Sequence, residues 1–142
     1  MKTGFLSLIT HPDHPGMVRV QLGDTPPELI AMQDGGQFRY VARFRDGEAG
    51  LMHVQNAMHS HLEDLENRIY RRPLGEMIAC VEADGLDHER VWMDPALDDA
   101  QLNSIDRDIK KRRSARKRSD RIWQIVGYLA LLLLILASLR LG

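Results

Sequence analysis

The stretch GFLSLITHPDHPGMVRVQ, residues 4–21, contains two short runs rich in apolar and β-branched side chains. The runs 4–10 and 17–21 are separated by a loop that holds two prolines and Gly16. Such runs form strands, and proline with glycine between them favours a reversal of the chain. The stretch therefore predicts a β-hairpin at the start of the fold.

Five further elements are expected after the hairpin, and the spacing of their apolar residues decides their type. Alternation with period two indicates a half-buried strand, whereas steps of three or four indicate an amphipathic helix. Mixed strands and helices of this kind predict an α+β domain over residues 1–93. The expected elements are a short helix over 28–32, a strand over 38–45, a long helix over 51–69, a strand over 77–83 and a last strand over 91–93.

The C-terminal part of the chain has a different composition. Residues 122–139, IWQIVGYLALLLLILASL, carry no charge. As a helix they rise about 27 Å, close to the roughly 30 Å of bilayer hydrocarbon. Trp123 is placed as an aromatic anchor at the membrane interface. We therefore predict a transmembrane helix over residues 122–140, a single-pass anchor near the end of the chain, that is, a tail anchor.

Charge is divided unevenly along the chain, although the formal net charge is only −1. Residues 1–105 hold 9 basic and 17 acidic side chains, and residues 106–121 hold 9 basic and 3 acidic ones. By the positive-inside rule, this predicts a cytoplasmic N-terminal domain at the inner membrane of a cell, with the basic segment on anionic lipid headgroups. The basic side chains are Arg107, Lys110, Lys111, Arg112, Arg113, Arg116, Lys117, Arg118 and Arg121.

Residues 94–121 connect the domain to the predicted span. Asp94 and Pro95 are typical of a helix start, and a thin apolar stripe follows. We predict a juxtamembrane helix from about residue 95, open to continuation into the span. The stripe has two alternatives, because it could pack on the domain or on a second copy of the chain.

Several residue types that often carry chemistry have a structural explanation here. Cys80 is the only cysteine and lies in an apolar run, which favours a buried thiol. In residues 38–45 the aromatic and basic side chains alternate, so we expect the aromatics to line the core rather than nucleic acid. His11, His14 and Asp13 share a loop and are a weak metal candidate. His53, His59 and His61 are not spaced to share one helix face.

The hairpin followed by a proline-containing segment, a strand and a helix with the sequence AMHSHL resembles the GIY-YIG endonuclease superfamily, in particular its small phage-type branch. The resemblance covers about residues 4–83 and implies metal-assisted hydrolysis of DNA, with two hairpin tyrosines, a helix arginine and a carboxylate that holds Mg²⁺. Glu76 occupies the position of that metal-binding carboxylate. His59 matches a histidine common on the long helix of this branch.

The chain departs from the family at the residues that carry the reaction. Ser7 stands where the first motif has tyrosine, and Gln21 where the second motif has glycine. Leu29 and Ile30 occupy the expected place of the arginine. A single carboxylate holds Mg²⁺ poorly without substrate, and an acidic domain repels a polyanion. The resemblance thus implies a pseudo-nuclease domain without catalytic residues.

Three functional hypotheses follow. The first is a tail-anchored membrane protein that displays a non-catalytic GIY-YIG-like module for protein interaction, with no cofactor. The second is a membrane-tethered, Mg²⁺-dependent nuclease or hydrolase in which Arg19 and His59 assist Glu76. The third is an accessory subunit of a larger membrane complex. A protein partner and anionic lipid are expected in the first case, self-association is open, and nucleic acid is not expected.

Overall fold

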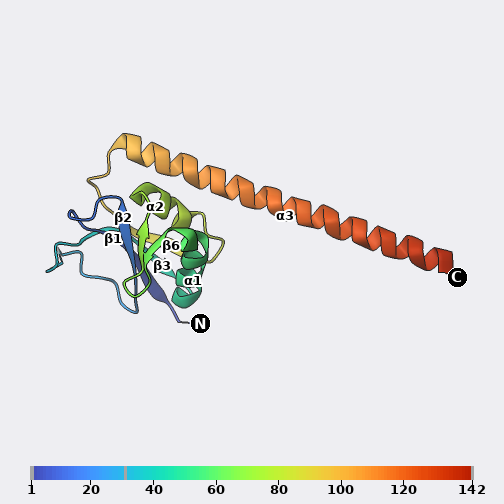
Figure 1. Cartoon of the computed structure of the whole chain (residues 1–142), viewed down its shortest axis with the longest axis horizontal. Helices are drawn as coiled ribbons and strands as arrows, with labels where there is room; N and C mark the ends of the chain where they lie inside the picture. The colour runs from blue at the N-terminus through green and yellow to red at the C-terminus, as the bar shows by residue number, and fades with distance from the viewer. Residues whose placement is uncertain (1, 31, 142) are drawn as a thin grey trace.

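The computed structural model describes residues 2–30 and 32–141, in which an α+β domain is followed by one long helix that extends away from it (Figure 1). Within these residues, six strands form a single sheet in the order β4-β5-β2-β1-β3-β6. All neighbouring strands are antiparallel. The strands are β1 (Gly4–Thr10), β2 (Met17–Gly23), β3 (Gln37–Phe44), β4 (Leu62–Asp64), β5 (Ile69–Arg71) and β6 (His88–Met93).

The predicted hairpin is confirmed and forms the centre of the sheet. β1 pairs with β2 in a register that sets Ser7 opposite Gln21, and β3 pairs with the other side of β1. The loop between the strands closes through the amide of Met17, which donates to the carbonyl of His14. The predictions of strands at 38–45 and 91–93 are also confirmed by β3 and β6.

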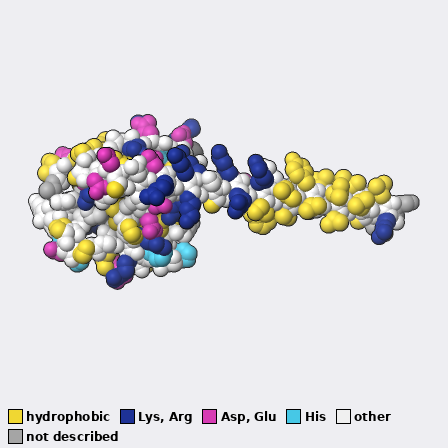
Figure 2. Space-filling model, turned by 90° about the horizontal axis from the view of Figure 1, so that it is seen from above, with side chains coloured by type: hydrophobic (Ala, Val, Ile, Leu, Met, Phe, Trp, Pro, Cys, Tyr) yellow, Lys and Arg dark blue, Asp and Glu magenta, His cyan; other side chains and the backbone are white. Residues whose placement is uncertain are grey.

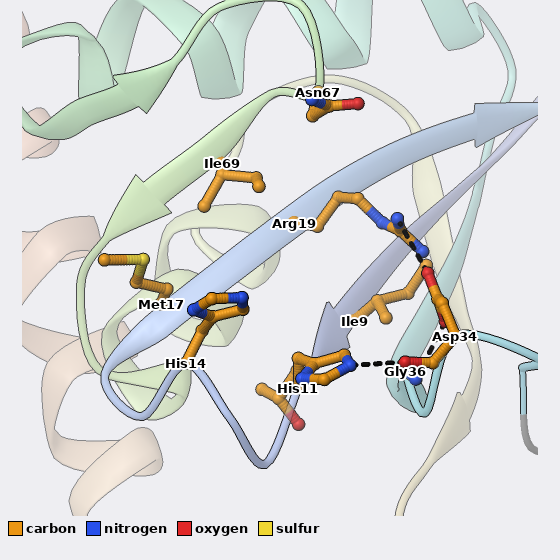
Figure 3. Close-up of a pocket in the computed structure, with 10 residues that line it drawn as sticks. Ile9, His11, His14, Met17, Arg19, Asp34, Gly36, Asn67 and Ile69 are labelled. Atoms are coloured by element: carbon orange, nitrogen blue, oxygen red, sulfur yellow. Dashed lines mark hydrogen bonds and ion pairs between the residues drawn. The ribbon is translucent and has the colours of Figure 1, made fainter.

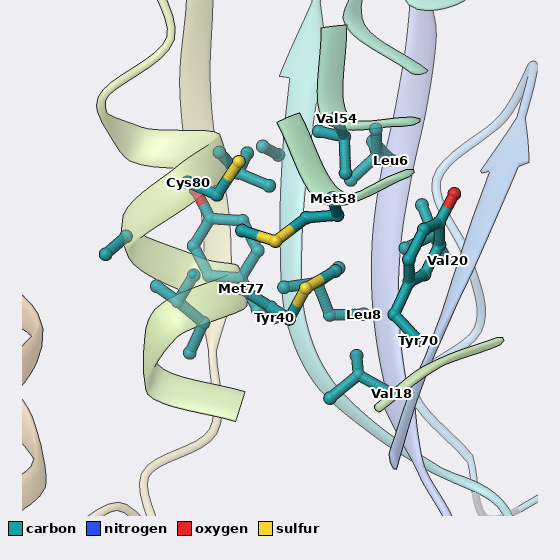
Figure 4. Close-up of a cluster of buried hydrophobic side chains, with 14 of the residues drawn as sticks. Leu6, Leu8, Val18, Val20, Tyr40, Val54, Met58, Tyr70, Met77 and Cys80 are labelled. Atoms are coloured by element: carbon teal, nitrogen blue, oxygen red, sulfur yellow. The ribbon is translucent and has the colours of Figure 1, made fainter. Parts of the chain in front are cut away.

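Helices cover one face of the sheet and bury its apolar side chains (Figures 1 and 4). The helices on this face are α1 (Gly47–Met58) and α2 (Leu74–Glu82), and the first part of α3 (Asp99–Leu141) packs on α2. Because side chains alternate along a strand, Leu6 and Leu8 of β1 face these helices together with Val18 and Val20 of β2. Each side chain buried in this way contributes about 1.5–3 kcal/mol, so packing on this face stabilises the domain.

Two glycines allow α1 to lie against the start of β1. A Cβ atom on Gly47 would lie 2.7 Å from the Cα of Gly4, and a Cβ on Gly4 would lie 2.8 Å from the Cα of Gly47. The helix begins at this contact, where the Asp46 carboxylate accepts from the amide of Ala49 at 3.2 Å. The first glycine of the opening hairpin therefore sets how closely the helical layer packs.

The short helix predicted over residues 28–32 is wrong for the described residues, because 28–30 and 32 have no helical structure. Instead a turn forms in which the amide of Gly35 donates to the carbonyl of Met32 at 2.9 Å. Two prolines precede this segment and two glycines follow it, so too few residues are left to compensate the cost of helix nucleation. Leu29 and Ile30 are exposed in this loop.

The long helix predicted over residues 51–69 is correct only as far as Met58. A short 3₁₀ turn (His59–His61) follows, and then β4 and β5 form a hairpin. The Asp64 carboxylate accepts from the amide of Asn67 at 3.1 Å, and Arg68 has a left-handed φ of 52°. Leu65 is 73% exposed, so the apparent helical stripe did not reflect burial in this part of the chain.

The strand predicted over residues 77–83 is wrong, since these residues belong largely to α2. A short continuous apolar run fits either a buried strand or a buried helix. Here Met77, Ile78, Ala79, Cys80 and Val81 are all buried because α2 lies between the sheet and α3. The interpretation of Cys80 as a buried thiol is confirmed, and burial raises its pKa.

The helix predicted from about residue 95 forms, but it begins at Asp99. Asp98 and Gln101 form a reciprocal cap in which each side-chain oxygen accepts the other residue's amide, at 2.7 and 3.0 Å. Of the two alternatives for the apolar stripe, packing on the domain is the observed one, since Ile105 and Ile109 join the core. The segment 94–121 is thus partly a component of the domain.

Candidate functional site

A cleft of about 330 Å³ lies on the sheet face opposite the helices (Figure 3). Ile9 and Arg19 face it because they alternate with Leu8, Val18 and Val20, which face the helical layer. Apolar side chains alternate with polar ones around the opening. The lining residues are Ile9, Thr10, His11, His14, Met17, Arg19, Asp34, Gly36, Asn67 and Ile69.

His11 is fixed in one tautomer at the edge of the cleft. Its Nδ1 accepts from the amide of Asp13 at 3.1 Å, so the proton sits on Nε2, which donates to the carbonyl of Asp34 (Figure 3). The ring of His14 lies 5.3 Å from that of His11, centroid to centroid. Both nitrogens of His11 are engaged, and within residues 2–30 and 32–141 no three His, Cys, Asp or Glu side chains form a group suited to a metal ion.

Asp34 and Arg19 form the charged side of the cleft. The Asp34 carboxylate accepts from the amide of Gly36 at 2.9 Å, and an Arg19 guanidinium nitrogen lies 3.4 Å from it. The hydrogen bond from Gly36 lowers the pKa of Asp34, and the charge of Arg19 acts in the same direction. Arg19 also contacts the sulfur of Met32, so its head group is held over the cleft.

The three residues that sequence reasoning singled out for catalysis are not brought together. Arg19 lies at the cleft, whereas Glu76 lies in the first turn of α2 in the helical layer, paired with Arg72 at 2.9 Å. Arg72 donates in turn to His61. His59 follows the last turn of α1, and its Nδ1 lies 2.9 Å from the carbonyl of Asn56. Each of these side chains therefore binds a different partner, and the three do not form one site.

Ser7 lies at the middle of the central strand and is only 3% exposed. It pairs with Gln21 on one side and Val41 on the other. The position at which the GIY-YIG resemblance implies a reactive tyrosine is thus a small buried side chain. Asp34 and Asn67, which are not among the predicted site residues, line the cleft, whereas Ser7 does not. The Asp-Gly pair at 34–35 was the one available signal, since it marks a turn.

Two of the three aromatic side chains of β3 belong to the core, as predicted, whereas Phe38 is half-buried and lies outside it. Tyr40 and Phe44 are fully buried, and the Tyr40 hydroxyl donates to the Glu82 carboxylate at 2.8 Å. Burial raises the pKa of Tyr40, and the nearby charge of Glu82 adds to this. Burial also acts to raise the pKa of Glu82, but hydrogen bonds from Arg90 and Tyr40 outweigh it and leave that pKa lowered.

Helix α3 has one end docked on the domain and a long apolar end that is wholly exposed. It is long and apolar enough to cross a membrane. Lys and Arg side chains gather where the helix leaves the domain, ahead of the apolar part (Figure 2). Trp123 follows this basic segment and is 71% exposed.

The nine basic side chains of residues 106–121 differ in their surroundings. Arg113 donates to the carbonyl of Glu82, in the last turn of α2, at 2.9 Å. Arg112 and Arg116 line a cavity between α3 and the domain. Lys110, Lys117 and the remaining basic side chains are exposed. Part of the predicted lipid-facing set thus contacts the domain.

Comparison of the chain with protein-family models, with curated proteins and with solved structures finds no match.

Proposed function

We propose that this chain is a single-pass membrane protein that displays a non-catalytic, GIY-YIG-like domain at the cytoplasmic face of the inner membrane, where the domain binds a protein partner. The observation that carries the proposal is the continuity of α3. The helix is docked to the core through Ile105 and Ile109 and then continues as a stretch whose leucines are all half or more exposed. Such a stretch is stable in lipid and not in water.

The orientation in the proposal rests on the positions of the basic side chains. Nine of them precede the apolar stretch, whereas Arg140 alone follows it within the given sequence. Because basic flanks are retained in the cytoplasm, the domain is expected on that side.

Alkaline carbonate extraction and protease protection test the membrane part of the proposal. The chain is expected to stay in the pellet after carbonate treatment. Protease added to inside-out vesicles is expected to remove the domain, and protease added to spheroplasts is expected to leave it intact. Release by carbonate, or cleavage only in spheroplasts, would contradict the proposal.

The cleft is the proposed contact surface for the partner. Ile9, Met17 and Ile69 offer an apolar floor for a side chain of an extended peptide segment, and the polar rim offers hydrogen bonds to its backbone. A photo-crosslinking residue placed at His14 is expected to give a discrete product in cells, which Arg19→Glu removes. The matched control is the same residue at Met52, which is exposed on α1. An identical product from both positions would refute the cleft as the contact surface.

The arrangement of Arg19, His59 and Glu76 does not support the nuclease alternative, because the three side chains lie in different parts of the domain. Its test is plasmid cleavage by the full chain in detergent with Mg²⁺ or Mn²⁺. Cleavage by the wild type that disappears in Glu76→Ala would show that the domain is catalytic and would contradict the proposal.

A further inference from the structure

A second cavity, of about 370 Å³, lies where α3 passes the ends of α1 and α2. Its walls come from all three helices. On α3, Leu102, Ile105 and Ile109 face the domain at steps of three and four residues, and Arg112 and Arg116 continue the same face. The lining residues are His53, Asn56, Ala57, Cys80, Ala83, Asp84, Arg112 and Arg116. The docking face therefore changes from isoleucine to arginine as it approaches the apolar stretch.

Arg112 and Arg116 form no ion pair within the described residues, so their charges are available to a ligand. Within the described residues, neither has a carboxylate oxygen within 4.0 Å, whereas Arg113 is already used on the carbonyl of Glu82. The acidic side chain of the cavity, Asp84, is matched by His53 at 3.1 Å and by the amide of Leu86 at 2.8 Å. The guanidinium groups can therefore bind a further anionic acceptor.

Gly85 seats the guanidinium of Arg116. A Cβ atom at this position would lie 2.5 Å from one terminal nitrogen of Arg116 and 2.6 Å from its Cζ. The missing side chain lets the guanidinium lie directly against the loop after α2. Arginine donors held in a fixed plane match the oxygens of a phosphate group.

With residues 122–139 in the membrane as proposed, the cavity lies just outside the layer of lipid headgroups. Arg116 precedes Ile122 by six residues and Arg112 by ten, which at 1.5 Å per residue places them about 9 and 15 Å before the apolar stretch. The polar layer of a bilayer extends about 5–8 Å beyond the hydrocarbon on each side. Arg116 is therefore the nearer of the two to the headgroups, within a few ångströms of their layer.

We propose that this cavity binds the phosphate group of an anionic phospholipid and so holds the domain in a fixed orientation against the membrane. The inference rests on the proposed membrane insertion and adds a specific site to it. Asn56 supplies a further donor on α1, and Ala57, Ala83 and Cys80 form the apolar wall. The rest of the basic segment then acts as diffuse charge, and Arg112 and Arg116 act as the binding residues.

Cys80 provides a reporter for the site, since it is the single cysteine of the chain and lines the cavity. The full chain is held in uncharged maltoside micelles, and the rate of Cys80 alkylation by N-ethylmaleimide is followed by mass spectrometry. Added phosphatidylglycerol is expected to slow alkylation several-fold and saturably. Phosphatidylcholine, or inorganic phosphate at the same concentration, is expected to have little effect. Slowing by inorganic phosphate without slowing by phosphatidylglycerol would overturn the lipid assignment.

Two double variants that lose the same charge distinguish binding of phosphatidylglycerol at the cavity from general attraction of the lipid to the basic segment. R112Q/R116Q is expected to abolish the response to phosphatidylglycerol. K110Q/K117Q, whose residues lie on the opposite side of α3, is expected to retain it. Gly85→Ala displaces the guanidinium of Arg116 without changing charge and is expected to weaken the response. Equal loss in the two double variants, or no response in the wild type, would refute the site.

Carbonate extraction of R112Q/R116Q and of the wild type separates failure of the lipid site from failure of membrane insertion. A variant that stays in the membrane but responds to phosphatidylglycerol like the wild type refutes the site alone. Release of the wild-type chain refutes the membrane assignment itself.

Discussion

The two halves of α3 have the same secondary structure and opposite relations to their surroundings. In the first half, Ile105 and Ile109 are buried on one side and charged residues face outward. In the second half, Leu131, Leu134 and Leu139 point to different sides and are 61–74% exposed. A one-sided apolar stripe is covered by one protein surface, whereas an apolar surface on all sides is typical of a helix that is surrounded by a core or by lipid. Helix α3 therefore joins a half that packs on the domain to a half with the length and composition of a membrane span.

The largest expected effect comes from charging the second half. Leu132→Arg/Leu133→Arg places two cations near the centre of the apolar stretch, at a cost of about 5–7 kcal/mol for insertion. Carbonate extraction is expected to release this variant. The control, Ser114→Arg/Ala115→Arg, adds the same charge to the exposed basic segment and is expected to stay in the membrane. Retention of both variants would show that the second half is not a membrane helix.

The next effect comes from weakening the contact of the first half with the domain. Ile105 is 2% exposed, so Ile105→Ala is expected to lower the free energy of unfolding by about 2–5 kcal/mol. Urea unfolding of the full chain in detergent, followed by circular dichroism, measures the loss. Asn103→Ala, at an exposed position of the same helix, is the control. Equal stability of the two variants would mean that α3 is not part of the core.

The Tyr40–Glu82 hydrogen bond joins the sheet to the end of α2, next to the contact with Arg113. Tyr40→Phe is expected to cost about 1.5–3 kcal/mol, because the acceptor is charged. Burial raises the pKa of Tyr40 above its usual 10.0, so the unfolded chain ionises first and the wild type loses stability as the pH rises above about 10. This alkaline loss is expected to be smaller in Tyr40→Phe. An unchanged alkaline profile would contradict the role given to Tyr40.

Glu82 gives the opposite pH dependence. Its folded pKa is lowered, so its contribution is complete above the usual value of 4.5 and is lost as the pH falls through the folded pKa. Denaturant titrations between pH 7 and pH 3 are expected to show this loss in the wild type. In Glu82→Gln the dependence is expected to be shallower. Identical acid profiles would show that Glu82 does not couple folding to pH.

The smallest expected effect concerns the start of α3. Asp98→Ala removes the reciprocal cap with Gln101 and is expected to cost about 1 kcal/mol. Asp99→Ala, one residue later, is the control and keeps the cap. Hydrogen exchange of the first turn of α3 is expected to rise in Asp98→Ala only. Equal exchange in the two variants would mean that the cap does not hold the docked half in place.

The parts of the fold that were predicted correctly are those with a strong local signal. The hairpin at residues 4–21 has two strands separated by a proline-glycine loop, and both strands form as expected. The wrong predictions fall where a local pattern has two solutions. Residues 77–83 form a helix because sheet and α3 both cover them, and residues 62–71 form a hairpin because Asp64 and Asn67 close a turn.

Of the three residues considered for catalysis, Arg19 alone lies at the observed cleft, and His11 and His14 of the weak metal candidate also line it. Asp34 and Asn67 join Arg19 there from distant parts of the chain, and no spacing in the sequence links them. Glu76 and His59 were selected through a family resemblance and are occupied by local partners instead. The cleft could not be predicted because it depends on which strands become neighbours.

The sequence by itself determined that this protein has a β-hairpin at residues 4–21, a basic segment and an apolar helix long enough to span a membrane, because each depends on the composition or periodicity of one continuous stretch. The tertiary structure decided how α2 folds, that Ile105 and Ile109 dock α3 on the domain, and that Arg112 and Arg116 face a cavity while Lys110 and Lys117 face outward. These properties depend on contacts between segments far apart in the chain, and such contacts exist only once the sheet and helices have packed.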